Sequence, residues 1–138
     1  PYGEILIEEY IEGREITVAI LGGQALPVIE IIPEGGFYDY EHKYQKGKTQ
    51  YICPAALSKS ATDKVQRFAL KAFRSLGCHG YARVDFRLGL DERFYCLEVN
   101  TLPGMTETSL VPKAAKVNGI EFTQLIDTII RLSLSSTI

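Results

Sequence analysis

Runs of apolar and β-branched residues, separated by glycines, fill the first quarter of the chain. Three such runs follow one another, at 4–11 (EILIEEYI), 14–21 (REITVAIL) and 24–32 (QALPVIEII). Short apolar runs broken by glycine turns are typical of strands in an antiparallel meander. Pro27 cannot donate a backbone hydrogen bond, so the third strand is expected to lie at an edge or to be bulged there.

Two segments with the period of a helix follow later in the chain. One begins at Ser60, with Asp63 three residues on in the manner of a capping box, and Gly77 is expected to end it in the left-handed conformation. The other covers 121–134. Both carry apolar residues three and four apart, which predicts one buried face on each helix. These residues are Val65, Phe68, Ala69, Ala72, Phe73 and Leu76 in the first, and Phe122, Leu125, Ile126, Ile129 and Ile130 in the second.

The segments 80–88 and 93–100 alternate between apolar and polar residues and are close enough to form a hairpin. Residues 33–50 have no steady period and predict a long loop, which is uncommon unless it serves as a lid or binding element. We therefore predict one α+β domain with a mostly antiparallel sheet of about five or six strands. Helices 60–76 and 121–134 are expected to cover one face of this sheet, and the other face is expected to look into a cleft.

The hairpin carries the most informative polar residues. Side chains two apart in a strand share a face, so Arg83 and Asp85 point one way, as do Glu98 and Asn100. If Leu88 pairs with Tyr95, then Asp85 lies opposite Glu98. Two carboxylates and an amide oxygen would suit Mg²⁺, which prefers oxygen ligands, and Arg83 would add positive charge where negative charge develops. A solvated strand face with a surface ion pair is the alternative.

Composition and charge exclude several function classes. The 15 Lys and Arg residues against 17 Asp and Glu residues give a net charge of −2, without a dense basic run, so no nucleic-acid partner is expected. No apolar stretch approaches the roughly 20 residues of a membrane span. The start without Met indicates a piece of a longer protein. Three cysteines without a CxxC spacing favour reduced thiols in a cytoplasmic protein over a disulfide framework or a zinc site.

Several segments together resemble the carboxy-terminal part of the D-alanine–D-alanine ligase family, within the ATP-grasp superfamily. The resemblance runs in the expected order over nearly the whole chain. The ExN motif after an upstream aspartate is common to many ATP-grasp enzymes, whereas NTLPGMT followed by SLVP is specific to this ligase family. The segments are EILIEEYIEGREITVAIL, FYDYEHKY, GYARVDF and FYCLEVNTLPGMTETSLVP.

The resemblance implies an activity. In the family, ATP phosphorylates the carboxylate of one D-alanine, and the amine of a second D-alanine attacks the acylphosphate to give the dipeptide, ADP and phosphate. Two Mg²⁺ ions assist, with Mn²⁺ as an alternative. By analogy, the metal ligands are Asp85, Glu98 and Asn100. Arg83 corresponds to the arginine that binds the transferred phosphate and the oxyanion, and Gly104 to the glycine whose backbone N–H helps hold that oxyanion.

Other roles carry over from the family in the same way. Residues 8–11 (Glu8, Glu9, Tyr10, Ile11) resemble the hinge that reads adenine, and Glu15 the carboxylate that binds the ribose. Ser109 and Leu110 correspond to the residues that hold the carboxylate of the second substrate. The loop 35–48 resembles the mobile lid, in which Lys43 would contact phosphate and Tyr44 would latch the lid, a tyrosine going with D-alanine rather than D-lactate. The alternatives are ordinary strand carboxylates, a solvated lysine and a loosely packed ring.

The family's amino-terminal and central parts have no counterpart in this chain, so it is expected to be inactive alone. The missing parts are its expected partners, together with ATP and D-alanine, and a homodimer of the full-length protein would form largely through the amino-terminal part. Two alternatives stay open: another ATP-grasp ligase that joins a different carboxylate and amine, and a non-catalytic nucleotide-binding module.

Overall fold

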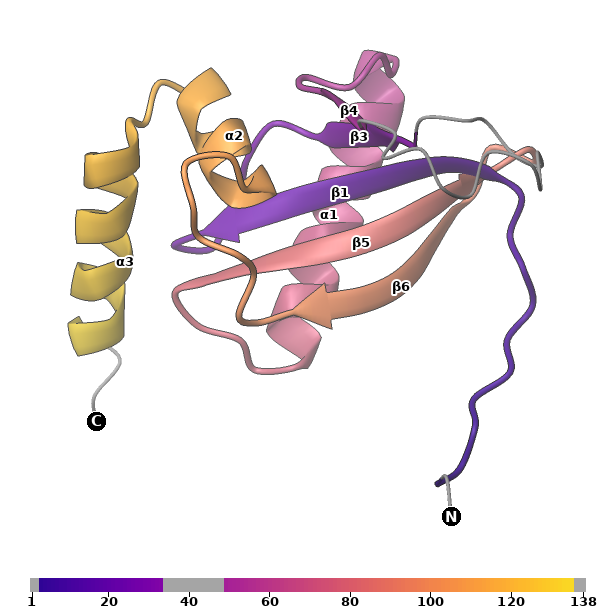
Figure 1. The fold of residues 1–138 in the computed structure, drawn as a ribbon, viewed down its shortest axis with the longest axis horizontal. Coiled ribbons are helices and arrows are strands. Elements are labelled where there is room, and N and C mark those ends of the chain that lie inside the picture. The colour runs from indigo at the N-terminus through magenta and orange to yellow at the C-terminus, as the bar shows by residue number, and fades with distance from the viewer. Residues whose placement is uncertain (1–2, 34–48, 136–138) are drawn as a thin grey trace.

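A computed structural model describes residues 3–33 and 49–135 of the chain. Its centre is an antiparallel sheet in the order β4-β3-β1-β5-β6, with β2 paired to β1 (Figure 1). The predicted α+β class and the predicted antiparallel pairing are confirmed. The strands are β1 (Gly13–Leu21), β2 (Gln24–Ala25), β3 (Ile29–Ile32), β4 (Gln50–Ile52), β5 (Tyr81–Gly89) and β6 (Phe94–Asn100).

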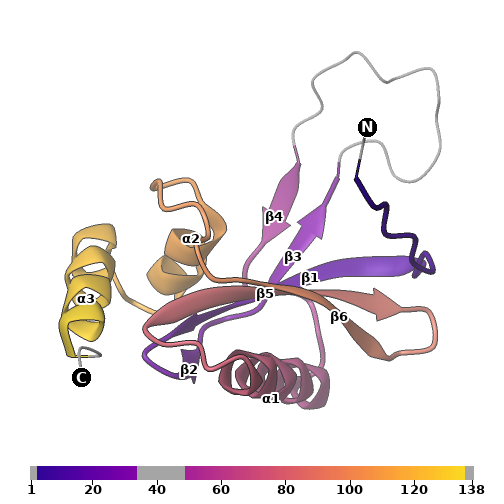
Figure 2. The same ribbon diagram turned by 90° about the horizontal axis from the view of Figure 1, so that it is seen from below.

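The helices cover both faces of the sheet, which corrects the prediction that they share one. Helix α1 (Lys59–Ser75) lies across one face, and α2 (Leu110–Val117) lies on the other (Figure 2). Helix α3 (Phe122–Ser135) packs beside α2 at one end of the sheet. The helical period at 121–134 identified a buried stripe but could not say which surface that stripe packs on. No helix within these described ranges is long and apolar enough to cross a membrane.

Two separate clusters of apolar residues follow from this arrangement. The larger lies between α1 and the sheet and includes Ile16, Val18, Val84 and Phe86. The smaller lies on the opposite face, where Ala19, Leu21 and Ile29 from the strands meet α2 and α3. The second face of the sheet is therefore apolar under α2. Beyond α2, the same face carries polar side chains, and no helix of the described residues covers it there (Figure 2).

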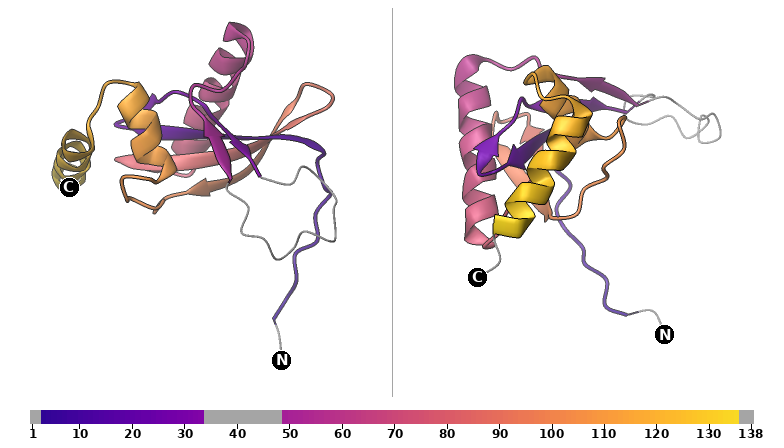
Figure 3. Two further views of the ribbon diagram at one scale, coloured as in Figure 1. Left: turned by 45° about the horizontal axis from the view of Figure 1, so that its top comes forward. Right: turned by 90° about the vertical axis from the view of Figure 1, so that its left-hand side faces the viewer.

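The first predicted strand is not a strand in the structure. Residues 3–12 have no strand pairing, and Glu4 to Tyr10 are exposed, with Ile5, Leu6 and Ile7 each more than 80% exposed. The segment leads into the start of β1 and extends away from the sheet (Figure 3). Its apolar pattern suits a strand, but the described part of the chain supplies no strand beside it. A strand needs a neighbour for its backbone hydrogen bonds, and sequence pattern alone does not provide one.

Two further sequence predictions are refined. The third predicted strand is interrupted at Pro27, so that β2 and β3 are separate strands on the same side of β1. Helix α1 begins one residue before Ser60 and is capped by Ser58, whose Oγ accepts a hydrogen bond from the backbone N–H of Ala61 at 3.2 Å. Gly77 follows the helix with φ of 63°, the left-handed conformation predicted for it.

Candidate active site

The β5–β6 hairpin brings the predicted metal ligands together through a β-bulge. Asp85 pairs with Glu98, as predicted, but Leu88 pairs with Phe94 and not with Tyr95. The register shifts by one residue because Leu97 has no partner on β5. If the register at Leu88 and Phe94 continued along the hairpin, Asp85 would lie opposite Leu97. The bulge shifts the register by one residue, so that Asp85 lies opposite Glu98. Without it, Glu98 would point to the face that α1 covers.

Arg83 and Asp85 form a two-pronged ion pair on the open face of β5. The Nε and Nη2 atoms of Arg83 donate to Oδ1 and Oδ2 of Asp85 at 2.9 and 2.8 Å. Thr17, opposite Asp85 on β1, donates from its hydroxyl to Oδ1 of Asp85 at 2.6 Å. Thr17 is almost fully buried, and the side chains of Arg83 and Asp85 are 20% and 16% exposed. The pair is thus fixed in place yet remains accessible from the open face.

Arg83 is influenced by more carboxylates than the one with which it forms an ion pair. Hydrogen bonding to Asp85 is the main reason that the pKa of Arg83 lies above its ordinary value, and partial burial opposes it. The charges of Asp85, Glu98 and Glu15 raise the pKa further. Arg83 therefore stays charged at any physiological pH. The surplus of carboxylates around one guanidinium favours the binding of a cation beside it.

The donor set on this face suits a hard divalent cation. Asp85 and Glu98 face each other across the strands, and Asn100 faces Arg83, so all four side chains share one face. Asn100 accepts a hydrogen bond from the backbone N–H of Leu102 at 3.1 Å through its Oδ1, which has a second lone pair. Two carboxylates and one amide oxygen fit Mg²⁺, which is typically held by one or two carboxylates plus water and phosphate. Among the described residues, no three or more His, Cys, Asp or Glu side chains are grouped so that they alone could hold a metal ion.

The loop after β6 brings Gly104 and Ser109 together. A Cβ atom added to Gly104 would lie 3.2 Å from the Oγ of Ser109. That Oγ accepts a hydrogen bond from the backbone N–H of Thr106 at 3.0 Å and lies 2.9 Å from the Thr106 hydroxyl. The two residues that the resemblance assigns to the oxyanion and to the second substrate are therefore neighbours. Thr106 fixes the position of the Ser109 side chain.

Ser109 occupies the N-cap position of α2 without capping it. Its side chain makes no hydrogen bond to the first turn of the helix, because Thr106 engages it instead. Leu110 and Val111 begin the helix, and Pro112, in the third position, has no backbone N–H. An uncapped helix start favours anions through its N–H groups and its dipole. This geometry suits the binding of the second substrate's carboxylate, which is the role that the resemblance implies for Ser109 and Leu110.

The segment that resembles a nucleotide hinge is attached to the polar face by Arg87. The Nε and Nη2 atoms of Arg87 donate to the carbonyl oxygens of Ile11 and Gly13 at 3.0 and 2.8 Å. The guanidinium also lies 5.6 Å from the centre of the Tyr10 ring. Glu15, the expected ribose ligand, pairs with Arg87 across β1 and β5. The expected base-reading and ribose-binding residues therefore adjoin the face that carries Asp85. Glu8 and Glu9 are exposed farther along the segment.

Two predicted site residues, Lys43 and Tyr44, lie outside the described residues, as does the whole of the predicted lid 35–48. In the described part, sequence reasoning missed three residues that organise the site: Thr17, Arg87 and Thr106. A signal existed for Thr17, because it interrupts the apolar run of the central strand with a hydroxyl. The roles of Arg87 and Thr106 depend on contacts with other segments or on loop geometry, which residue spacing does not reveal.

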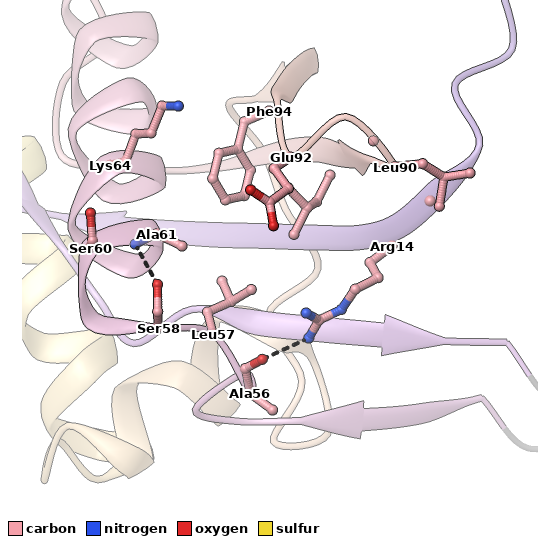
Figure 4. A pocket seen from close by; sticks show the side chains of 13 residues that line it. Arg14, Ala56, Leu57, Ser58, Ser60, Ala61, Lys64, Leu90, Glu92 and Phe94 are labelled. Carbon is pink, nitrogen blue, oxygen red and sulfur yellow. Dashed lines mark hydrogen bonds between the residues drawn. The ribbon is translucent and has the colours of Figure 1, made fainter.

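A pocket of about 540 Å³ opens on the other face of the sheet, between the start of α1, the start of β1 and the β5–β6 turn (Figure 4). Its Arg14 is paired with Glu30 by hydrogen bonds of 2.7 and 2.6 Å and donates to the carbonyl of Ala56 at 3.0 Å. None of the described residues predicted for the site lines this pocket. The candidate active site is the shallow polar face and not this cavity.

Solved structures identify the class of protein to which this fold belongs. The chain superimposes on a D-alanine–D-alanine ligase from Bacillus anthracis complexed with ATP, with a TM-score of 0.80 and 38% identity, over 93% of this chain and 40% of that one. The VanG D-Ala:D-Ser ligase from Enterococcus faecalis gives a TM-score of 0.78 and 35% identity, over 90% of this chain and 37% of that one. The fold is that of the carboxy-terminal part of the ATP-grasp ligases.

Sequence comparison gives the family within this class. The family model described as "D-ala D-ala ligase C-terminus" matches residues 2–131. The chain therefore belongs to the D-alanine–D-alanine ligase family, of which it represents the carboxy-terminal part. A D-alanine–D-alanine ligase from Syntrophotalea carbinolica is 51% identical over 126 residues, which are 91% of this chain and 41% of the relative. One from Methylacidiphilum infernorum is 54% identical over 129 residues, 94% of this chain and 43% of the relative. The chain spans about two fifths of the length of these relatives.

Proposed function

We propose that the complete protein joins two D-alanine molecules into D-alanyl-D-alanine and converts ATP to ADP and phosphate. The γ-phosphoryl group of ATP is transferred to a carboxylate oxygen of the first D-alanine, which gives an acylphosphate and ADP. The amine of the second D-alanine, after losing a proton, attacks the acyl carbon, and phosphate leaves as the peptide bond forms. The product would enter the synthesis of peptidoglycan precursors in the cytoplasm.

The observation that carries this proposal is the cluster of Arg83, Asp85, Glu98 and Asn100 on the open face of a domain of this family. Phosphoryl transfer depends mainly on positioning and on neutralising negative charge. Arg83 supplies a permanent positive charge, and its contacts with Asp85 fix its orientation before substrate arrives. The guanidinium would stabilise the transferred phosphoryl group and the oxyanion that forms at the acyl carbon.

Asp85, Glu98 and Asn100 would hold Mg²⁺ beside Arg83. The bound ions would neutralise charge on the phosphate oxygens as the phosphoryl group moves. Arg83 and Thr17 hold Asp85 in a single orientation, so its carboxylate is already placed on the open face. Glu98 lies on the neighbouring strand β6 and is exposed, so its side chain can reorient toward a bound ion.

The acceptor side of the site would be the loop from Gly104 to Ser109 and the start of α2. The Gly104 backbone N–H would donate to the oxyanion, and the Ser109 side chain with the Leu110 N–H would bind the carboxylate of the second D-alanine. The Thr106 contacts support this assignment, because they keep the Ser109 hydroxyl away from the helix that it would otherwise cap.

The nucleotide would lie where the Glu8–Ile11 segment meets the sheet. Backbone groups of this segment would contact the adenine, and Glu15 would accept hydrogen bonds from the ribose hydroxyls. The structure of the Bacillus anthracis relative complexed with ATP supports a nucleotide site in this family. Lys43 and Tyr44 would contact phosphate and latch a lid over the closed site, and Tyr44 favours D-alanine over D-lactate as second substrate.

The chain alone would form only part of this site. Its exposed segment 3–12 has the apolar pattern of a strand without a partner in the described residues, and the chain spans about two fifths of its relatives. We therefore infer that the missing amino-terminal and central parts complete the site and carry the contacts of a homodimer. The isolated 138-residue chain is expected to release no ADP in response to D-alanine.

The test of the proposed reaction is ADP release by the complete protein with Mg²⁺ and one amino acid at a time. D-Alanine alone is expected to support turnover, with D-alanyl-D-alanine detected by mass spectrometry, whereas L-alanine alone is not. D-Serine or D-lactate added with D-alanine tests the second substrate, since one structural relative is a D-Ala:D-Ser ligase. Turnover that needs D-serine or D-lactate would overturn the dipeptide assignment, and ADP release without any of these substrates would contradict the ligase mechanism.

A further inference from the structure

One arginine of β5, Arg87, contacts two residues of the segment that precedes β1, Tyr10 and Ile11, and also Gly13, the first residue of β1. Arg87 donates to the carbonyl oxygens of Ile11 and Gly13 at 3.0 and 2.8 Å, and its Nη2 lies 3.3 Å from the Tyr10 hydroxyl. The guanidinium also lies over the Tyr10 ring, 5.6 Å from its centre. A guanidinium can make all of these contacts at once, because it is planar and carries five N–H donors in a fixed geometry.

The backbone at Gly13 turns the chain at this point. Gly13 has φ of 145°, and a Cβ atom there would overlap the carbonyl oxygen of Leu88 on β5. Only glycine suits this conformation so close to the neighbouring strand. The direction in which the segment leaves the sheet is therefore set at Gly13, and the contacts with Arg87 maintain it for the residues just before.

Most of this segment is exposed and extends away from the sheet (Figure 3). It forms no strand pairing, Glu8 to Tyr10 are exposed, and the Tyr10 side chain itself is 60% exposed. Without a fixed position, a binding segment must lose conformational freedom when its ligand arrives, which weakens affinity. Because Arg87 already orders the residues that it contacts, less conformational freedom is lost when the ligand binds.

We propose that Arg87 is a positioning residue that fixes the Tyr10–Gly13 backbone on the sheet and thereby sets the affinity of the enzyme for its nucleotide. The inference rests on the proposed function, in which the Glu8–Ile11 segment contacts the adenine. Arg87 acts through this segment and not on the reacting atoms, which Arg83 and Asp85 face. Nucleotide affinity should therefore depend on Arg87 much more than the chemical step does.

The variant Arg87→Gln in the complete protein separates these effects. The KM for ATP and the dissociation constant of a fluorescent ATP analogue are expected to rise about tenfold, the effect of a net loss of one charge-assisted hydrogen bond, since the Gln amide can still donate to one of the two carbonyls. The kcat and the KM for D-alanine are expected to change by less than about twofold. Hydrogen exchange should become faster in a peptide covering 4–13 and stay unchanged in one covering α1.

Three further variants serve as controls. Arg93→Gln removes the same charge from the β5–β6 turn, where the side chain is 76% exposed, and is expected to leave all these quantities unchanged. Arg87→Lys keeps the charge but not the planar fork, so it should restore only part of the affinity. Tyr10→Leu removes the stacked ring at an exposed position and should weaken nucleotide binding in the same direction without a risk to folding.

The outcomes distinguish this inference from the proposed reaction. An Arg87→Gln protein with unchanged analogue binding and unchanged exchange in 4–13 would overturn the inference, as would equal losses in kcat and in ATP affinity. Full rescue by Arg87→Lys would show that charge alone matters and would also overturn it. If the complete protein binds the analogue but does not turn over D-alanine, the proposed reaction fails, and binding and exchange still decide the role of Arg87. If the unaltered protein binds no nucleotide, both fail.

Discussion

Replacing Thr17 with valine tests whether the sheet holds Asp85 in the orientation that catalysis needs. The Thr17 side chain is 1% exposed, and its hydroxyl donates to Asp85 at 2.6 Å. Valine has nearly the same shape and lacks the donor. The packing of β1 against β5 should therefore survive, while Asp85 loses this hydrogen bond and keeps the two from Arg83.

The expected size of the effect follows from these contacts. A hydrogen bond to a charged group contributes about 1.5–3 kcal/mol. Asp85 retains both bonds to Arg83 and is 16% exposed, so water can replace part of what is lost. We therefore expect the low end of that range, about 1.5 kcal/mol, which corresponds to roughly a tenfold lower rate.

The assay is D-alanine-dependent ADP release by the complete protein at saturating ATP, with Mg²⁺ varied. Thr17→Val should lower kcat about tenfold and raise the Mg²⁺ concentration needed for half-maximal rate. Thr17→Ser, which keeps the hydroxyl and loses only a methyl group, is the matched control and should stay within about threefold of the unaltered protein. A valine variant with the full rate and the same Mg²⁺ dependence would refute the role given to this hydrogen bond.

Three other predictions concern separate parts of the fold. Cys96 is exposed in part, but the partial burial of its thiol, and to a smaller extent the charge of Asp85, raises the pKa of that thiol, so less thiolate is present at neutral pH. Iodoacetamide should therefore modify Cys96 slowly at pH 7, and a rate equal to that of a free thiol would contradict this. Ser58→Ala should lower the free energy of unfolding by about 1 kcal/mol in urea denaturation, whereas Ser60→Ala should change it by less than about 0.5 kcal/mol; the reverse order would mean that the helix starts later. Ser109→Ala should raise the KM for the second D-alanine about tenfold and leave the KM for ATP unchanged. An equal rise in the two KM values would argue against a role of Ser109 in binding the second D-alanine.

The hairpin shows how far sequence reasoning can reach in this protein. Alternation placed Asp85 opposite Glu98 correctly, but the pairing of Leu88 with Tyr95 on which that step relied was wrong. The bulge at Leu97 changes the phase of the alternation, so Cys96 lies on the face that α1 covers, opposite Phe86. Simple alternation carries no signal for such an extra residue, because each half of the strand remains regular on its own.

Tertiary arrangement accounts for the other differences. The apolar stripe of the last helix was recognisable from Leu125 and Ile129, yet only the structure shows that it packs beside α2 on the opposite face from α1. The 4–11 segment reads as a strand from its own residues but has no neighbouring strand in the described chain. Local pattern predicts what a segment can form, and the surface that it meets decides what it does form.

The most direct test is to compare Glu98→Gln with Glu92→Gln in the complete protein, using Mg²⁺-dependent ADP release in response to D-alanine. Both variants remove one negative charge from the β5–β6 hairpin, but only Glu98 faces Asp85 on the open side of the sheet. We predict a loss of about 100-fold or more in kcat for Glu98→Gln and a change of less than about twofold for Glu92→Gln. Equal activity of both variants and the unaltered protein would contradict the assignment of this face as the centre of phosphoryl transfer.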